Sequence, residues 1–145
     1  AALCKAGRQD IAIKEIRDYW GGMLDEGATS FWELYNPEEK GADKYSMYGR
    51  RYGKSLCHSW GASPLYLLGR YFAGCNPVGD GTYEVKPCLC GMKEMKMTVP
   101  TATGSIEVDM TEERLCVRAR GVDCKVSVYG KTCDLTAGKE ITLYR

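Results

Sequence analysis

Apolar residues recur at three- and four-residue steps near the start of the chain. Between Arg8 and Leu24 the recurring side chains are Ile16, Tyr19, Trp20, Met23 and Leu24. Charged residues fill the positions between them, so the apolar side chains share one stripe of a helix and the charged ones face the other way. The pattern predicts an amphipathic helix, and Gly27 is a typical C-terminal stop.

A second helical pattern covers residues 63–74, "SPLYLLGRYFAG". Ser63 suits the N-cap position and Pro64 the first helical position, because proline lacks the N–H that would be unpaired there. Gly74 ends the run. The preceding residues 55–62, "SLCHSWGA", can form an earlier turn of the same helix, bent where Pro64 removes a donor.

After Asn76-Pro77 the hydrophobic period changes to two. Short alternating segments span residues 82–87, 94–100, 104–110, 114–121, 124–130, 131–138 and 139–145. In the fourth of these, Leu115, Val117 and Ala119 point to one side and the arginines between them to the other. Short alternating strands separated by Gly, Pro and Asp turns predict a compact antiparallel β-sandwich.

The order of these patterns predicts an α+β fold with two parts, helices in residues 1–76 and a β-sandwich in residues 77–145. Two helices cannot enclose their own apolar area, because layers of secondary structure need partners. Either the helices lie across the sandwich, or their partners belong to sequence outside this chain, and we favour the second. Residues 36–54, rich in turn formers and charge, predict a long loop that either has a functional role or packs on another part of a larger protein.

Charge and hydropathy exclude some classes of partner. The chain has 20 basic and 19 acidic side chains, for a formal charge of +1. A near-neutral balance removes the usual electrostatic reason for binding nucleic acid or an anionic membrane, and no apolar run approaches the length of a membrane span. We therefore expect neither nucleic acid nor a membrane as partner.

The eight cysteines are irregularly spaced. Cys88 and Cys90 form a CxC rather than the CxxC pair of a zinc site, and the chain has a single histidine. Scattered reduced thiols at apolar positions are favoured over a disulfide framework or a metal site, and no cofactor is expected. Reduced thiols favour the cytoplasm. The first residues lack a signal-peptide layout, but a periplasmic parent protein stays open.

One carboxylate stands among aromatic residues in "GATSFWELYN", residues 27–36. Glu33 lies beside Trp32, and a carboxylate packed against indole in a partly dry pocket has a raised pKa and can act as acid or base. The alternative is a loop glutamate with its head in water beside ordinary core aromatics.

The single histidine lies in "CHSWG", two residues before Trp60. A neutral imidazole gives directional hydrogen bonds and an indole gives a flat apolar face, which together suit a sugar. The alternative is a core histidine satisfied by backbone groups. No phosphate-binding loop, nucleophile elbow or HExxH motif occurs.

Three strings in the chain resemble the C-terminal end of bacterial α-L-rhamnosidases of glycoside hydrolase family 78. They are "YWGGMLDEGATSFWE", "SLCHSWGASPLYLLGRYFAGCNP" and, more weakly, "VPTATGSIEVDM". The resemblance covers about residues 10–110. It implies that residues 1–76 are the last helices and the catalytic loop of a six-hairpin (α/α)6 toroid, and that residues 77–145 are the terminal β-sandwich. Ser30, Ala102 and Met110 depart from the family pattern.

The resemblance also implies roles for single residues. Glu33 matches the general base of these inverting hydrolases, and His58 matches a histidine that contacts the sugar. Trp32 and Trp60 are expected to help line that pocket. In inverting glycosidases the general acid stands roughly 6.5–9.5 Å from the base, across the scissile bond.

The family's general acid lies in a part of the toroid that this chain does not contain. The chain is therefore expected to be a C-terminal fragment that releases no terminal α-L-rhamnose when isolated. Its expected partners are a rhamnose-containing glycoside or oligosaccharide and the N-terminal catalytic region of the same protein. The alternative from another class is a non-catalytic carbohydrate-binding or structural β-sandwich module.

Overall fold

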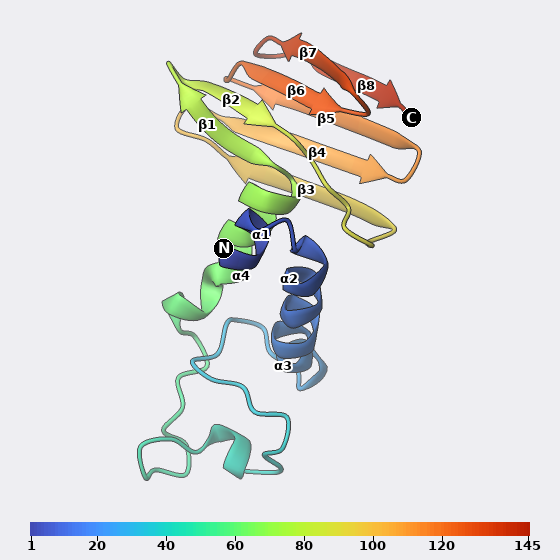
Figure 1. The fold of residues 1–145 in the computed structure, drawn as a ribbon. Helices are drawn as coiled ribbons and strands as arrows, with labels where there is room; N and C mark the ends of the chain where they lie inside the picture. Colours follow the sequence, from blue (N-terminus) through green and yellow to red (C-terminus); the bar gives the residue numbers. More distant parts are fainter. The chain divides into compact units, whose positions relative to one another are not determined.

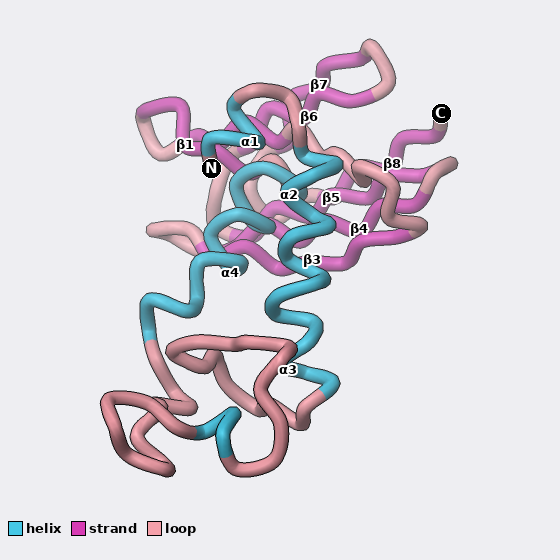
Figure 2. Tube along the Cα trace, turned by 60° about the horizontal axis from the view of Figure 1, so that its bottom comes forward, coloured by secondary structure: helices cyan, strands magenta, loops and turns pink.

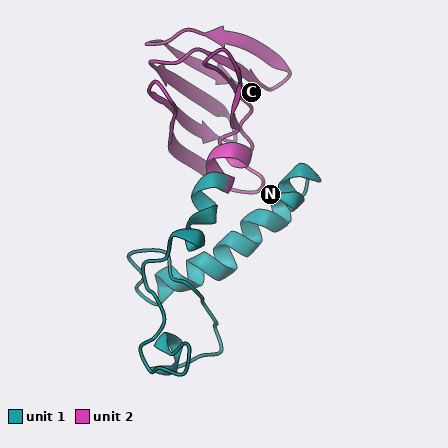
Figure 3. Cartoon of the chain, turned by 90° about the vertical axis from the view of Figure 1, so that its left-hand side faces the viewer, with its two compact units in different colours: residues 1–66 teal, residues 67–145 magenta.

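Helices and strands are segregated along the chain in a computed structural model that describes residues 1–145 (Figure 1). The chain divides into unit 1, Ala1–Tyr66, and unit 2, Leu67–Arg145 (Figure 3). Unit 1 holds helices and a long irregular segment, and unit 2 holds eight strands. The predicted α+β class is confirmed. No helix combines the length and the apolar character needed to cross a membrane.

Unit 1 begins with the predicted helix. The short α1 (Ala2–Lys5) comes first. It is followed by α2 (Gln9–Ile16), which continues without a break into the π-helical turn η1 (Arg17–Gly21) and then into α3 (Gly22–Asp25). Gly22 permits a close approach, because a Cβ there would lie 2.4 Å from the Tyr35 hydroxyl oxygen. Gly27 has a φ of 84° just beyond the end of the helix, as predicted.

The remainder of unit 1 is mostly irregular (Figure 2, pink). Its regular pieces are the 3-10 turns η2 (Asp43–Tyr45) and η3 (Ser59–Ala62) and an isolated β-bridge between Met47 and Arg50. Residues 36–54 thus form the long loop that the sequence predicts. Its backbone is shaped by side-chain contacts rather than by a repeating ladder, and it contributes a residue to the candidate site.

The second helical segment starts earlier than its predicted cap. Ser63 has helical dihedral angles and begins α4 (Ser63–Leu67), which continues as the π-helical turn η4 (Leu68–Phe72). The 3-10 turn η3 precedes it, with His58 at its N-cap, so Ser63 is not the N-cap. The prediction of an earlier turn ahead of Pro64 is confirmed. Gly74 ends the segment with a φ of 70°.

Unit 2 is a sandwich of two four-stranded sheets (Figure 1). One sheet has the order β1 (Cys75–Gly79), β2 (Thr82–Val85), β6 (Cys124–Val128), β7 (Lys131–Leu135). The other has the order β3 (Glu94–Pro100), β4 (Ser105–Thr111), β5 (Arg114–Arg120), β8 (Glu140–Tyr144). All seven predicted segments contain a strand. Pairing is antiparallel throughout, except that β2 and β6 are parallel, which the prediction of a purely antiparallel sandwich missed.

Strand β1 was not predicted, because Pro77 breaks the pattern of a central strand. The strand lies at the edge of its sheet, where a missing N–H is tolerated. Asp80 and Gly81, both with positive φ, join β1 to β2 in a two-residue hairpin of the type that follows the twist of the strands.

The boundary between the units falls between Tyr66 and Leu67, earlier than the predicted division after residue 76. The last helical turn packs with the strands: a Cβ on Gly69 would lie 3.6 Å from Val99 of β3. Phe72 is fully buried, and its carbonyl accepts a hydrogen bond of 2.8 Å from the Cys88 N–H. The end of this helix therefore belongs to the core of unit 2.

The core of unit 2 follows the predicted alternation. On β4 and β5 every second side chain is buried, and on β6 Cys124 and Val126 are buried. The fully buried large side chains are Phe72, Val85, Ile106, Val108, Leu115, Val117 and Val126. Arg118 and Arg120 face the opposite side of β5, as the sequence predicts.

Most cysteines are free, as predicted, but two are not. Cys4, Cys75 and Cys124 are buried free thiols, whereas Cys57 is exposed. Cys88 and Cys90 form a disulfide, which corrects the expectation that all thiols are reduced. Their Cα atoms lie 5.5 Å apart, within the range that a disulfide spans.

Thiol labelling at about pH 8 is expected to separate these groups. Burial raises the pKa of Cys75 to about 12 and that of Cys124 to about 11, so almost no thiolate forms on them in the folded chain. Ellman's reagent should modify Cys57 first, and Cys75 and Cys124 only after unfolding, as peptide mapping would show. Equal rates for Cys57 and Cys75 in the folded chain would contradict the buried placement.

Candidate active site

Two irregular segments of unit 1 run beside each other and bring the candidate residues together. The Glu33 N–H donates to the Ser55 carbonyl at 2.9 Å, and the His58 N–H donates to the Phe31 carbonyl at 2.8 Å. The Ser30 hydroxyl donates to the Leu56 carbonyl. These bonds pair residues 30–33 with residues 55–58, so the predicted base and the predicted sugar-binding histidine lie next to each other.

The Glu33 carboxylate is held by donors on both oxygens. The Tyr48 hydroxyl donates to Oε1, and the Ser55 N–H donates to Oε2 at 3.1 Å. His58 Nδ1 lies 4.0 Å from Oε2. Only 7% of the Glu33 side chain is exposed. Such a carboxylate is fixed in orientation and shielded from most of the solvent, as a general base requires.

The electrostatics correct one sequence-based expectation. The pKa of Glu33 is lowered rather than raised, because the Tyr48 hydroxyl and the Ser55 N–H donate to its charged form and outweigh desolvation. His58 and Lys54 lower the pKa further. The side chain is therefore a carboxylate at neutral pH, and it can accept a proton but cannot donate one.

His58 and Trp60 form an open aromatic pair beside the carboxylate. Their ring centroids lie 4.6 Å apart with an interplanar angle of 46°. Trp60 is 71% exposed, so one face of its indole is free to stack against a ligand. The imidazole lies close to both the indole and Glu33, where it can hydrogen-bond a ligand.

Trp32, also predicted to line the pocket, lies in the interior of unit 1. It is 5% exposed, and its ring meets that of Tyr45 edge-on with centroids 5.9 Å apart. A Cβ on Gly61 would lie 2.7 Å from the Trp32 carbonyl, and the Gly61 carbonyl accepts a hydrogen bond from Trp20 Nε1 at 2.7 Å. Trp32 thus packs beneath the segment that carries Trp60.

Sequence reasoning missed Tyr48 and Ser55. Both lie far from Glu33 along the chain, and their spacing gives no periodic signal. The only local hint is Tyr48-Gly49, a turn-forming pair within the long loop. From here on, the Glu33 site means Glu33, Tyr48, Ser55, His58 and Trp60.

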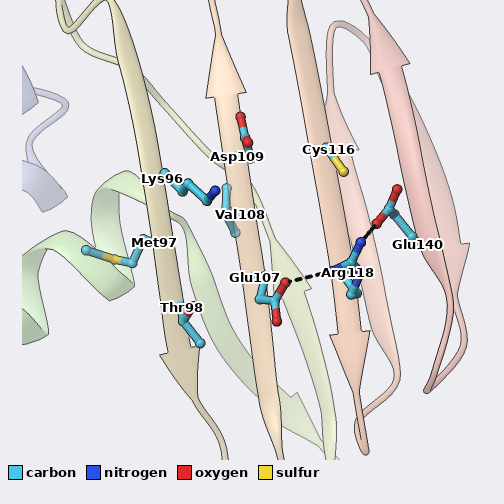
Figure 4. Close-up of a pocket in the computed structure, with 9 residues that line it drawn as sticks. All are labelled: Lys96, Met97, Thr98, Glu107, Val108, Asp109, Cys116, Arg118 and Glu140. Carbon is cyan, nitrogen blue, oxygen red and sulfur yellow. Dashed lines mark hydrogen bonds and ion pairs between the residues drawn. The ribbon is translucent and has the colours of Figure 1, made fainter.

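Two of the hollows in the structure are lined by residues other than those of the Glu33 site. An apolar hollow of about 260 Å³ in unit 1 is lined by Trp20, Met23, Leu24, Ala28, Thr29, Ser30 and Phe31. A groove of about 170 Å³ lies on the β3-β4-β5-β8 sheet (Figure 4). It is lined by Lys96, Met97, Thr98, Glu107, Val108, Asp109, Cys116, Arg118 and Glu140.

The groove on the sheet is the natural candidate for the binding-module alternative. In it, Arg118 bridges Glu107 and Glu140 (Figure 4, dashed lines). Its lining contains no aromatic side chain on which a sugar ring could stack. The Glu33 site, with an exposed indole beside an imidazole, has the more suitable chemistry for a sugar.

No group of three or more His, Cys, Asp or Glu side chains gathers in a way that could hold a metal ion. The groups that the Glu33 site offers a ligand are one carboxylate, one imidazole and one indole face. This set can accept a proton, donate a hydrogen bond and stack against an apolar surface.

The fold is similar to part of a known glycosidase. The crystal structure of a family GH78 rhamnosidase of Bacillus sp. GL1 matches with a TM-score of 0.63 and 27% sequence identity. The match covers 88% of this chain but only 14% of that chain. This chain therefore has a GH78-like fold and corresponds to a small part of that enzyme.

A second solved structure, described as "Putative kojibiose phosphorylase from human microbiome", matches at 12% identity and a TM-score of 0.43. That match covers 60% of this chain and 11% of the other. No protein-family model and no curated protein matches the sequence.

Proposed function

We propose that this chain is the C-terminal part of an inverting glycoside hydrolase that releases terminal α-L-rhamnose, with Glu33 as its general base. One observation carries the proposal. In a chain with a GH78-like fold, a shielded carboxylate accepts two hydrogen bonds beside an imidazole and an exposed indole. In the intact protein, residues 1–76 would complete the end of an α/α toroid and residues 77–145 the terminal sandwich.

Glu33 would act on the water molecule that attacks the sugar. Its lowered pKa keeps it ionised, so it can take a proton from water as the bond to the anomeric carbon forms. A carboxylic acid on the opposite side of the sugar would protonate the leaving oxygen. We assign that acid to the N-terminal catalytic region of the same protein, so this chain carries half of the catalytic pair.

His58 and Trp60 would hold the sugar. Rhamnose is a 6-deoxy sugar, and its methyl group and C–H bonds give it an apolar side that can stack on the exposed indole of Trp60. The imidazole of His58 can hydrogen-bond a sugar hydroxyl. Trp32 would contribute from beneath, by fixing the backbone from which Glu33 extends.

The test is product analysis with the intact protein and p-nitrophenyl α-L-rhamnopyranoside. We expect release of p-nitrophenol, with β-L-rhamnose as the first anomer seen by proton NMR, because one displacement inverts the anomeric carbon. The matched control is the α-L-fucopyranoside, another 6-deoxy sugar, which should react far more slowly. The 145-residue chain alone should release nothing.

Two outcomes would contradict the proposal. Absence of hydrolysis by the intact protein would reject the assigned activity. If α-L-rhamnose formed first, configuration would be retained, and Glu33 would not be the base of an inverting reaction.

A further inference from the structure

We infer that Tyr48 is a positioning residue for the Glu33 carboxylate, delivered by a loop that is built around the buried ammonium group of Lys54. The inference rests on the proposed function, since it assigns a helper to the proposed base. It also extends that function, because Tyr48 lies in the long loop outside the strings that resemble known rhamnosidases.

The backbone at Tyr48 is shaped to present its side chain. Met47 and Arg50 exchange two backbone hydrogen bonds of 3.0 Å, which closes a two-residue turn. Tyr48 and Gly49 occupy its centre with φ values of 55° and 72°. A residue with a Cβ pays for this left-handed conformation by about 1–2 kcal/mol, so a compensating contact is expected.

The conformation of Tyr48 is explained by its contact with the Glu33 carboxylate rather than by packing into a core. Tyr48 is 73% exposed, so burial of its ring does not explain its conformation. Its hydroxyl donates to Glu33 Oε1. The aromatic ring acts as a rigid spacer that carries one donor from the loop to the carboxylate.

Lys54 fixes the loop that presents Tyr48. Its side chain is 1% exposed, and its Nζ donates to Glu39 Oε2 at 2.9 Å and to the Lys44 carbonyl at 2.5 Å. The Lys54 N–H also donates to the Tyr45 carbonyl at 3.1 Å. A buried charge is tolerated only when it is paired and hydrogen-bonded, so the loop is folded around this group.

Two further contacts tie the loop to the rest of unit 1. Lys44 pairs with Glu26 just beyond α3, and the Tyr45 ring meets the buried Trp32 ring edge-on. The segment on one side of the Tyr48 turn is thus fixed to the helix and the interior, and Lys54 fixes the segment on the other side. The Tyr48 side chain therefore extends to Glu33 from a loop whose backbone is fixed on both sides of the turn.

The arrangement has a direct consequence for the proposed base. The Tyr48 hydroxyl donates to Oε1 and the Ser55 N–H donates to Oε2. Donors from two different segments therefore fix the plane of the carboxylate. The charged or titratable groups that act on its pKa are Tyr48, His58 and, without a direct contact, Lys54. Because these donors are already in place, the base does not have to be oriented during the reaction, which would cost free energy.

The test is a carbon-13 NMR titration of the Glu33 carboxyl group in the 145-residue chain and in its Tyr48→Phe variant. Removing the hydroxyl removes the largest cause of the lowered pKa, so the pKa should rise. In the intact protein the same variant should lower kcat/KM by about tenfold to a hundredfold and move the acid limb of its pH profile upward.

Tyr52→Phe is the matched control, because Tyr52 is similarly exposed and lies in the same loop. Tyr52→Phe should leave both the pKa of Glu33 and the pH profile of kcat/KM unchanged. The reciprocal variant Glu33→Gln should lower the pKa of Tyr48, which the carboxylate raises, and this measurement does not depend on the folding of Tyr48→Phe.

The outcomes separate this inference from the proposed function. If neither pKa moves, the contact is absent and the inference is overturned. If both move but Tyr48→Phe keeps full activity while Glu33→Gln loses it, Tyr48 does not position the base. If Glu33→Gln keeps full activity, the proposed function itself fails.

Discussion

Replacing Glu33 with Gln in the intact protein is expected to lower kcat by about 10²- to 10⁴-fold, the usual contribution of a positioned general base. Glutamine has nearly the same shape, and its carbonyl oxygen can still accept the Ser55 N–H. It cannot take a proton from water. The variant should therefore keep the fold and the affinity for rhamnosides while losing turnover, which initial rates and ligand titration would separate.

The matched control for this prediction is Glu38→Gln, which removes an exposed carboxylate from the same unit without touching the Glu33 site or the Lys54 pair. It should leave kcat unchanged. Glu33→Ala offers a second readout, since added azide can replace the missing water activation and give a glycosyl azide of inverted configuration. Near-normal kcat in Glu33→Gln would show that Glu33 is not the base.

The protonation state of Glu33 shows where sequence reasoning reached its limit. Its aromatic neighbours in the sequence suggested a dry pocket and a raised pKa. Folding instead brings the Tyr48 hydroxyl and the Ser55 N–H to its two oxygens from 15 and 22 residues away. Those donors lower the pKa of Glu33, and the residues next to Glu33 in the sequence do not reveal them.

Two of the three tryptophans illustrate the same limit for binding surfaces. Trp32 and Trp60 were both expected to line the pocket. In the structure Trp32 is buried against Tyr45, whereas Trp60 is open beside His58. Both tryptophans lie in or next to two segments that pair over a long range, residues 30–33 with residues 55–58, and the local sequence does not show that pairing.

The sandwich was easier to predict, because its signal is local. Alternation along β4 and β5 reflects one buried and one wet face, and a shift of one residue would reverse every side chain. The exceptions are again non-local. Strand β1 contains Pro77 and is recognisable only by its place at the sheet edge, and the parallel pairing of β2 with β6 depends on how distant segments meet.

The second large effect concerns the stability of the sandwich. Leu115→Ala is expected to lower the free energy of unfolding of unit 2 by about 2–5 kcal/mol. Leu115 is 0% exposed and lies on β5, which pairs with β4 on one side and with β8 on the other. Truncation there leaves a cavity between strands that cannot move together without breaking both ladders.

Cys116→Ala is the control, one residue further along the same strand. Cys116 faces the charged groove on the sheet and is half-buried, so its truncation should change the free energy by no more than about 0.5 kcal/mol. Urea unfolding followed by far-UV circular dichroism would measure both, while tryptophan fluorescence reports on unit 1, which contains all three tryptophans. Equal losses for the two variants would mean that the two faces of β5 are not divided into core and solvent. In that case the register of the β3-β4-β5-β8 sheet described above would be wrong.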